Sequence, residues 1–159
     1  MTLQELLKDT QIGVTGLASE WAEVEINEND RDAAWELHVE MSTRIVTEPL
    51  PPEVGDEKAA LTSIYSLFPA TREILRRHGR QTVGFSRVAV PVLNHVVRPF
   101  TAKWHKESLD GAFEDQDRIR QFRQELKELQ SHLRNYNRVL AEMAEVEELD
   151  CGNSERGQS

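Results

Sequence analysis

The stretch PVLNHVVRPFTAKWH, residues 91–105, decides the fold of this chain. Its valines, together with Leu93 and Phe100, leave almost no polar face, and a helix that is apolar all round is enclosed by its neighbours. The run is too short to cross a bilayer, which takes about 20 consecutive apolar residues. We therefore expect residues 91–105 to form the buried central helix of an all-α domain.

A second helix is marked by an apolar seam near the C-terminal end of the sequence. Its members follow one another at alternating spacings of three and four residues over about four heptads: Ile119, Phe122, Leu126, Leu129, Leu133, Tyr136, Leu140 and Met143. The seam predicts a long helix that either packs inside a bundle or binds a second copy of itself.

Two further helices precede the central one. The first is capped by Asn29 or Asp30 and runs to about Val46, and the next begins at Asp56 and ends at Gly79. Pro69 interrupts the latter, so that it kinks or splits after Phe68. In the first helix the expected buried stripe is Ala34, Trp35, Leu37, His38, Met41 and Ile45.

Four helices with short connections predict an antiparallel four-helix-type bundle over residues 28–147. Residues 1–27 are expected to be an N-terminal arm or short helices. A lone strand at residues 22–26 would have no partner, so this part is expected to be helical or extended. Residues 148–159 lack apolar groups and are expected to be a disordered tail.

Charge is distributed unevenly along the 159 residues, whose formal net charge is −9. Residues 1–56 carry a net charge of −10, residues 57–113 of +5 and residues 114–159 of −4. An acidic chain repels the phosphate backbone at long range, which argues against non-specific duplex binding. The basic middle third leaves a local anion-binding site open.

Several kinds of chemistry find no support in the sequence. Cys151 is the single cysteine, so we expect neither an intramolecular disulfide nor a thiolate zinc site, which fits a reducing cytoplasm. The Glu-x-x-His pairs of di-iron bundles and the glycine-rich phosphate loops are missing. We expect no metal, no cofactor, no membrane segment and a cytoplasmic location.

Arg98 and His105 form the first candidate site. Seven positions turn an α-helix by about 700°, so both side chains would lie on one face. The pair resembles the Arg-x4–6-His signature of the HEPN superfamily, all-α proteins of which many are metal-independent ribonucleases acting as dimers. The resemblance implies that His105 is the general acid/base at the ribose 2′-hydroxyl, and that Arg98 stabilises charge on the phosphate.

A structural role for the same two residues is the alternative. Pro99 stands where HEPN motifs usually carry a polar residue, and a proline disfavours α geometry at the residue before it. On this interpretation Arg98 leaves the helix and pairs with a carboxylate such as Glu36 or Glu40, while Trp104 packs over the joint.

Three longer segments carry a second resemblance. LNHVVRPFTAKWH, AAWELHVEMSTRI and YSLFPATREIL resemble segments of small bacterial all-α proteins of undefined role, some of them linked to phage defence. The resemblance implies a bacterial, cytoplasmic protein and attaches no activity to it.

A basic cluster near the middle of the chain is the second candidate site. Guanidinium groups bind phosphates and carboxylates in bidentate fashion, and the cluster comprises Arg72, Arg76, Arg77, Arg80 and Arg87. It would bind an acidic protein, RNA or a nucleotide. The alternative is that these arginines neutralise the acidic first third of the same fold, or complement a helix C-terminus.

Our leading hypothesis is a non-enzymatic helical interaction module, in a bacterial defence or regulatory complex, that contacts a protein partner or itself through the seam or the basic cluster. A HEPN-type ribonuclease acting on RNA is the first alternative. A sensor of a small anionic ligand or nucleotide at the arginine cluster is the second.

Overall fold

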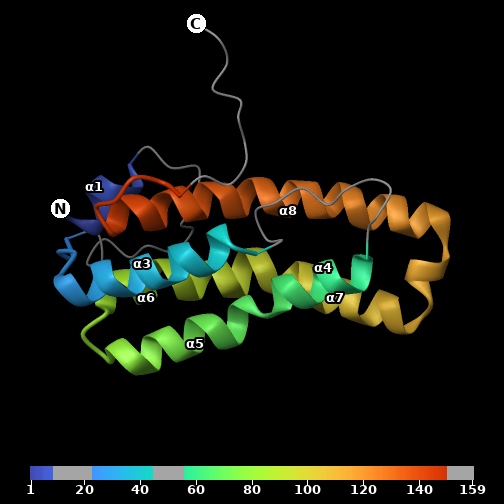
Figure 1. Ribbon diagram of the computed structural model, residues 1–159, viewed down its shortest axis with the longest axis horizontal. Helices are drawn as coiled ribbons and strands as arrows, with labels where there is room; N and C mark the ends of the chain where they lie inside the picture. The colour runs from blue at the N-terminus through green and yellow to red at the C-terminus, as the bar shows by residue number, and fades with distance from the viewer. Residues whose placement is uncertain (9–22, 45–55, 150–159) are drawn as a thin grey trace, which may run out of the picture.

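The computed structural model describes residues 1–8, 23–44 and 56–149, and these residues are predominantly helical with no strand element among them (Figure 1). The longer helices are α3 (Glu28–Ser42), α4 (Glu57–Tyr65), α5 (Leu67–His78), α6 (Val83–Val92), α7 (Arg98–Leu109) and α8 (Gln116–Met143). Three short elements complete them: α1 (Leu3–Leu7), the π-helical turn η1 (Leu93–Val97) and the 3-10 turn η2 (Ala112–Glu114). The all-α prediction is confirmed.

The predicted set of four principal helices is not confirmed, because the second of them is two helices. α4 ends and α5 begins around Ser66, three residues ahead of Pro69, whereas we expected either a kink at the proline or a split after Phe68. Pro69 has no N–H to donate to the carbonyl of Tyr65, so the hydrogen-bond ladder of α4 cannot continue there. The Ser66 hydroxyl donates to the carbonyl of Ser63, in the last turn of α4, at 2.5 Å. The two ends of this segment are as predicted: Asp56 caps α4, and Gly79, with φ +76°, follows α5.

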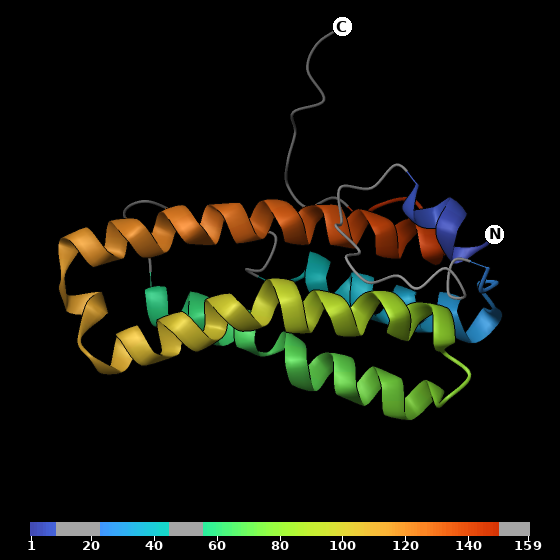
Figure 2. The same ribbon diagram turned by 180° about the vertical axis from the view of Figure 1, so that it is seen from behind.

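α6, η1 and α7 follow one another as one long rod that carries the stretch 91–105 (Figure 2). The π-turn shifts the hydrogen bonds by one residue, so that the N–H of Arg98 reaches the carbonyl of Leu93. Pro99 then falls in the first turn of α7, where its missing N–H leaves no bond unmade. Arg98 keeps φ −59° and ψ −43°, so the expectation that Pro99 drives it out of α geometry is wrong.

The expectation that this rod is enclosed on all sides is also wrong. Asn94, His95 and Arg98 are exposed, and the side chain of Val90 is 40% exposed. The opposite face, with Val88, Val92 and Val97, is buried. The rod is therefore amphipathic, and its polar groups meet water instead of buried partners.

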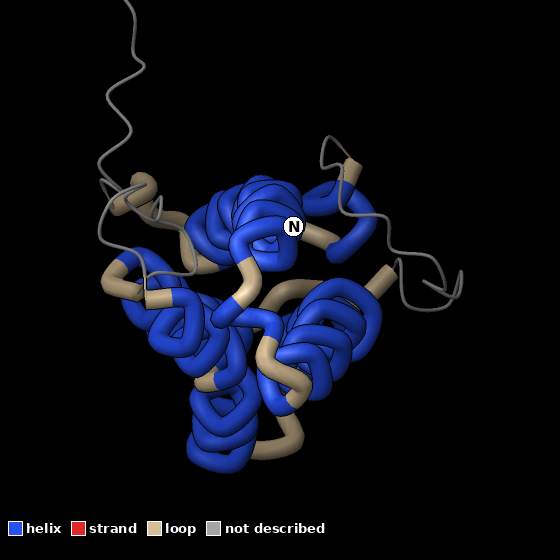
Figure 3. Tube along the Cα trace, turned by 90° about the vertical axis from the view of Figure 1, so that its right-hand side faces the viewer, coloured by secondary structure: helices blue, strands red, loops and turns tan. Residues whose placement is uncertain are grey.

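α8 supplies one side of the core through the predicted seam. All members of the seam from Phe122 to Met143 are buried, and only Ile119 is half-buried. α8 packs on α3 and along the α6–α7 rod, and the end-on view shows the helices gathered around a shared interior (Figure 3). The seam is thus used inside the chain, which removes it as a surface for self-association.

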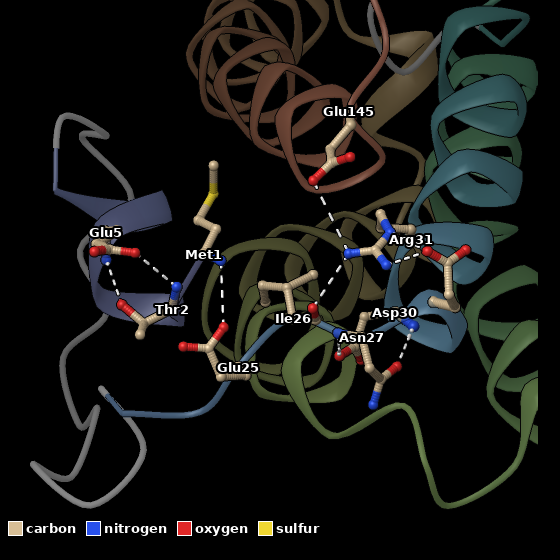
Figure 4. Close-up of polar contacts among 10 residues, drawn as sticks. Met1, Thr2, Glu5, Glu25, Ile26, Asn27, Asp30, Arg31 and Glu145 are labelled. Carbon is tan, nitrogen blue, oxygen red and sulfur yellow. Dashed lines mark hydrogen bonds and ion pairs between the residues drawn. The ribbon is translucent and has the colours of Figure 1, made fainter.

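The N-terminal residues, the start of α3 and the end of α8 meet at one junction (Figure 4). Thr2 pairs with Glu25 in an antiparallel bridge, so the extended residues 24–26 do have a partner, contrary to the sequence-based expectation. α3 is capped by Asn27, two residues before the first predicted cap. Arg31 joins the segments: it binds Glu28, donates to the carbonyl of Ile26 at 3.3 Å and lies 3.9 Å from Glu145.

Glu145 offers a first test of this junction. It ends α8 with φ +58°, a left-handed conformation that glycine adopts without the steric cost of a Cβ atom. We expect Glu145→Gly to raise the free energy of unfolding by about 0.5–1 kcal/mol in urea denaturation. Glu145→Ala is the matched control, since it removes the carboxylate but keeps the strain. Equal gains in both variants would assign the effect to charge.

Candidate partner-binding surface

Four arginines of the predicted cluster lie on α5 and on the turn that follows it. α5 is an outlying helix on the side of the molecule opposite α8 (Figures 1 and 2). It packs chiefly on α3 through Leu67, Thr71 and Ile74. Arg87 sits apart from the other four on α6, with a half-buried side chain.

Arg77 and the neighbouring His78 are bound to α3. Both reach Glu36: Arg77 through its guanidinium group and His78 through Nε2, 2.8 Å from the carboxylate. Burial works to raise the pKa of Glu36, but the hydrogen bonds from His78 and Arg77 outweigh it and the pKa is lowered. The alternative prediction, that these arginines neutralise the acidic first third of the same fold, is therefore correct for Arg77.

Arg72, Arg76 and Arg80 remain exposed, and within the described parts of the chain no carboxylate or other polar group contacts their side chains. We call these three the open arginines. Arg72 and Arg76 are one helical turn apart and so lie on one face of α5, and Arg80 follows just beyond Gly79. Their charges also suit the negative end of the α5 dipole.

A groove of about 440 Å³ lies between α3 and α5, and none of the open arginines lines it. Its apolar lining comes from Trp35, Val39, Pro69, Ala70 and Ile74. Ion pairs bound it at both ends: Arg77 with Glu36 and Glu73 at one, and Arg44 with Glu40 at the other, where Arg44 also donates to the Ser66 hydroxyl at 2.6 Å.

Trp35 is the residue of this groove that the sequence pattern misplaced. We expected it in the buried stripe of the first helix, but its side chain is 41% exposed, while Ala34, Leu37, His38 and Met41 are buried as predicted; Ile45 lies outside the described residues. An exposed tryptophan beside arginines has the composition of a protein-binding hot spot. Its position at the edge of the stripe is the only sequence signal that could have identified it.

The first candidate pair is placed elsewhere, on α7. Arg98 and His105 are both exposed on one continuous helix. The Arg98 guanidinium donates to Asn94 Oδ1 at 3.1 Å and lies 4.8 Å from the centre of the Phe68 ring. Its partners are therefore Asn94 and Phe68, and the expected pairing with Glu36 or Glu40 is wrong. Trp104 is buried against Phe113 and Phe122, near the middle of α7 and five residues after Pro99.

A second groove, of about 460 Å³, lies between the rod and α8. Lys103 crosses one part of it and binds both carboxylate oxygens of Glu125 at 2.8 Å, so its cation is already neutralised. Tyr136 lines the groove, but its hydroxyl is fully buried, and burial raises the pKa of this phenol. The groove therefore offers a ligand less free charge than the α3–α5 surface does.

Residues 1–8, 23–44 and 56–149 contain neither a three-residue metal-ligand cluster nor a helix that could span a membrane. No three histidine, cysteine or acidic side chains in these ranges could hold a metal ion together. No helix there is long and apolar enough to cross a membrane.

Comparison with known proteins adds no relative: no family model matches the chain, and no curated protein or solved structure matches it either.

Proposed function

We propose that the protein is a non-enzymatic helical module that binds an acidic, partly apolar segment of a partner protein across α3 and α5. The observation that carries the proposal is that α5 bears the open arginines Arg72 and Arg76 and, through other residues, also lines the Trp35 groove. The groove supplies apolar contact area, and the guanidinium groups that have no partner in the described part of the chain supply charge for carboxylates. α5 would then act as the binding helix of an antiparallel helical bundle, in a bacterial defence or regulatory complex.

Charge reversal at the open arginines tests this proposal. The probe is a fluorescein-labelled 20-residue peptide of alternating leucine and glutamate, whose binding is followed by fluorescence anisotropy at low salt. We expect the double variant Arg72→Glu, Arg76→Glu to weaken binding at least tenfold, equivalent to about 1.4 kcal/mol. Trp35→Ala should weaken it as well, since the apolar wall of the groove is lost.

The matched control is Arg120→Glu, because Arg120 is an exposed arginine on α8, far along the chain from the groove. It changes the net charge by the same amount per residue and should leave the affinity almost unchanged. Equal weakening by Arg120→Glu, or equal binding of a peptide with glutamine in place of glutamate, would contradict the proposal. Thermal stabilisation by a nucleotide that disappears on charge reversal at Arg76 and Arg77 would instead favour the small-ligand sensor.

A HEPN-type ribonuclease is the second candidate, and one observation favours it. Because Arg98 stays in α geometry, Arg98 and His105 do share a helix face, about 10 Å apart along the axis. Cleavage of single-stranded RNA in EDTA that is lost in both Arg98→Ala and His105→Ala would support this activity. Cleavage unaffected by either change would exclude these two residues as its catalytic groups.

A further inference from the structure

A buried histidine connects α3 with α8 and with the end of the described chain. His38 is 0% exposed, and its Nδ1 lies 2.7 Å from Asn137 Oδ1 on α8. Asn137 in turn donates from Nδ2 to the Ser42 hydroxyl at 3.0 Å. The other ring nitrogen, Nε2, accepts the backbone N–H of Leu149 at 3.2 Å. Both nitrogens of this imidazole are therefore engaged.

These partners fix the protonation state of the ring. A backbone N–H can only donate, so Nε2 must present its lone pair, and the single ring proton sits on Nδ1 and is donated to Asn137. A second proton, on Nε2, would point at the N–H of Leu149, and two donors cannot form a hydrogen bond with each other. The arrangement is thus compatible with the neutral imidazole and incompatible with the imidazolium.

Residues 144–149, which we call the strap, begin with backbone hydrogen bonds to α8, in which the N–H groups of residues 144–146 donate to carbonyls of the last helical turn. Their other described side-chain anchors are ion pairs near the surface: Glu145 lies 3.9 Å from Arg31, and Glu148 accepts from Arg138 at 3.0 Å. Exposed ion pairs contribute little and are screened by salt. Beyond Val146, the bond from the Leu149 N–H ties the strap to a fully buried ring.

We propose that His38 is a proton-operated latch: the neutral ring holds the strap against α3 and α8, and uptake of a proton at Nε2 releases it. The sign follows from proton binding. The released state binds one more proton than the held state, so the strap is held at high pH and released as the pH falls.

Other ionisable groups are carried by the elements that form the latch. They include Arg31 on α3, Arg134 and Arg138 on α8, and Glu145, Glu147 and Glu148 in the strap itself. Arginine keeps its charge throughout this range, and exposed carboxylates in general take up protons mainly below pH 5. Release above pH 5 therefore points to the histidine.

Amide hydrogen exchange at Leu149 in the unmodified chain tests the latch. After correction for the intrinsic exchange rate, we expect the ratio of released to held strap to rise on the order of thirtyfold from pH 7.5 to pH 5.0, since an exposed histidine takes up its proton in this range. Leu133, in the core of α8, should keep its protection throughout. The ¹⁵N spectrum of the His38 ring at pH 7.5 should show an unprotonated Nε2.

Three variants separate the latch from other causes. His38→Gln has no titrating group, so strap exchange should lose its pH dependence, whereas Glu148→Gln and the exposed His132→Gln should retain it. Should His38→Gln not fold, the ring spectrum and the exchange of the unmodified chain decide alone. A protonated Nε2 at pH 7.5 would refute the latch. So would amide exchange at Leu149 that does not change with pH, or a pH response that is lost in Glu148→Gln. Exchange at Leu133 that rises together with exchange in the strap would also refute it.

Discussion

Leu133→Glu is expected to unfold the protein. The Leu133 side chain is 0% exposed at the middle of the α8 seam, where a carboxylate would meet no cation. Loss of a buried leucine costs about 2–5 kcal/mol, and an unpaired buried charge adds several more. The total of at least about 5 kcal/mol matches the whole stability of many domains, so helical circular dichroism should be lost at 25 °C.

The matched control is Ser131→Glu, which places the same charge on the exposed face of α8 two residues away. It should change the free energy of unfolding by less than about 0.5 kcal/mol. Light scattering after size exclusion gives the other half of the test. A Leu133→Glu chain that stays helical while its mass falls to half that of the parent would mean that the seam joins two copies.

The sequence predicted α8 well because a single geometry satisfies its pattern. Spacings of three and four residues, repeated over about four heptads, put every large apolar side chain on one stripe, and no strand or loop can do the same. The predicted seam from Ile119 to Met143 accordingly lies inside α8. Its intramolecular use could not be predicted, because the stripe alone does not say which surface covers it.

The rod was harder to predict because two prolines bracket its central turn. A proline rule applied to Arg98 alone forecasts a break, whereas η1 moves the hydrogen-bond register so that Pro99 enters α7 at its first turn. Apolar content also misled us about burial. Val92 and Val97 are buried, but Val90 is exposed, and the neighbouring helices leave Asn94 and His95 in water.

The candidate surface, too, could be predicted only in part from the sequence. The basic cluster was identifiable from composition, yet which arginines are open depends on the helix that packs beside them. Glu36 faces α5 and takes Arg77 and His78, which leaves Arg72 and Arg76 on the outer face. The exposure of Trp35 was not predicted, because periodicity places a residue on the apolar stripe but does not show where a neighbouring helix stops covering that stripe.

Trp35 is an apolar residue that is exposed, whereas Asp30 is a charged residue that is 0% exposed. Its two carboxylate oxygens accept different backbone N–H groups: Oδ2 that of Asn27, at 3.0 Å, and Oδ1 that of Phe85 in the first turn of α6, at 2.9 Å. One side chain thus completes the capping box of α3 and also binds the first turn of α6, 55 residues away in the sequence. Asp30 therefore links α3 to α6 through hydrogen bonds.

Asp30→Ala should lower the free energy of unfolding by about 3–5 kcal/mol, because it leaves two N–H groups without their charged acceptor, each such bond contributing about 1.5–3 kcal/mol. Asp30→Asn keeps the shape but presents one oxygen, so an intermediate loss is expected. Urea denaturation followed by circular dichroism measures both. The exposed Asp32 provides the control, since Asp32→Ala should change stability by less than about 0.5 kcal/mol.

Gly84 gives an independent measurement of the same contact. A Cβ atom added there would lie 2.8 Å from Ile26 Cδ1 and 2.9 Å from Asp30 Oδ2, closer than packed atoms tolerate. Gly84→Ala should therefore destabilise the chain by at least about 1 kcal/mol, although alanine is the better helix former. Because both changes act on one contact, their effects should not add in the double variant. Full additivity, or an Asp30→Ala cost below 1 kcal/mol, would show that α3 and α6 are not joined through this carboxylate.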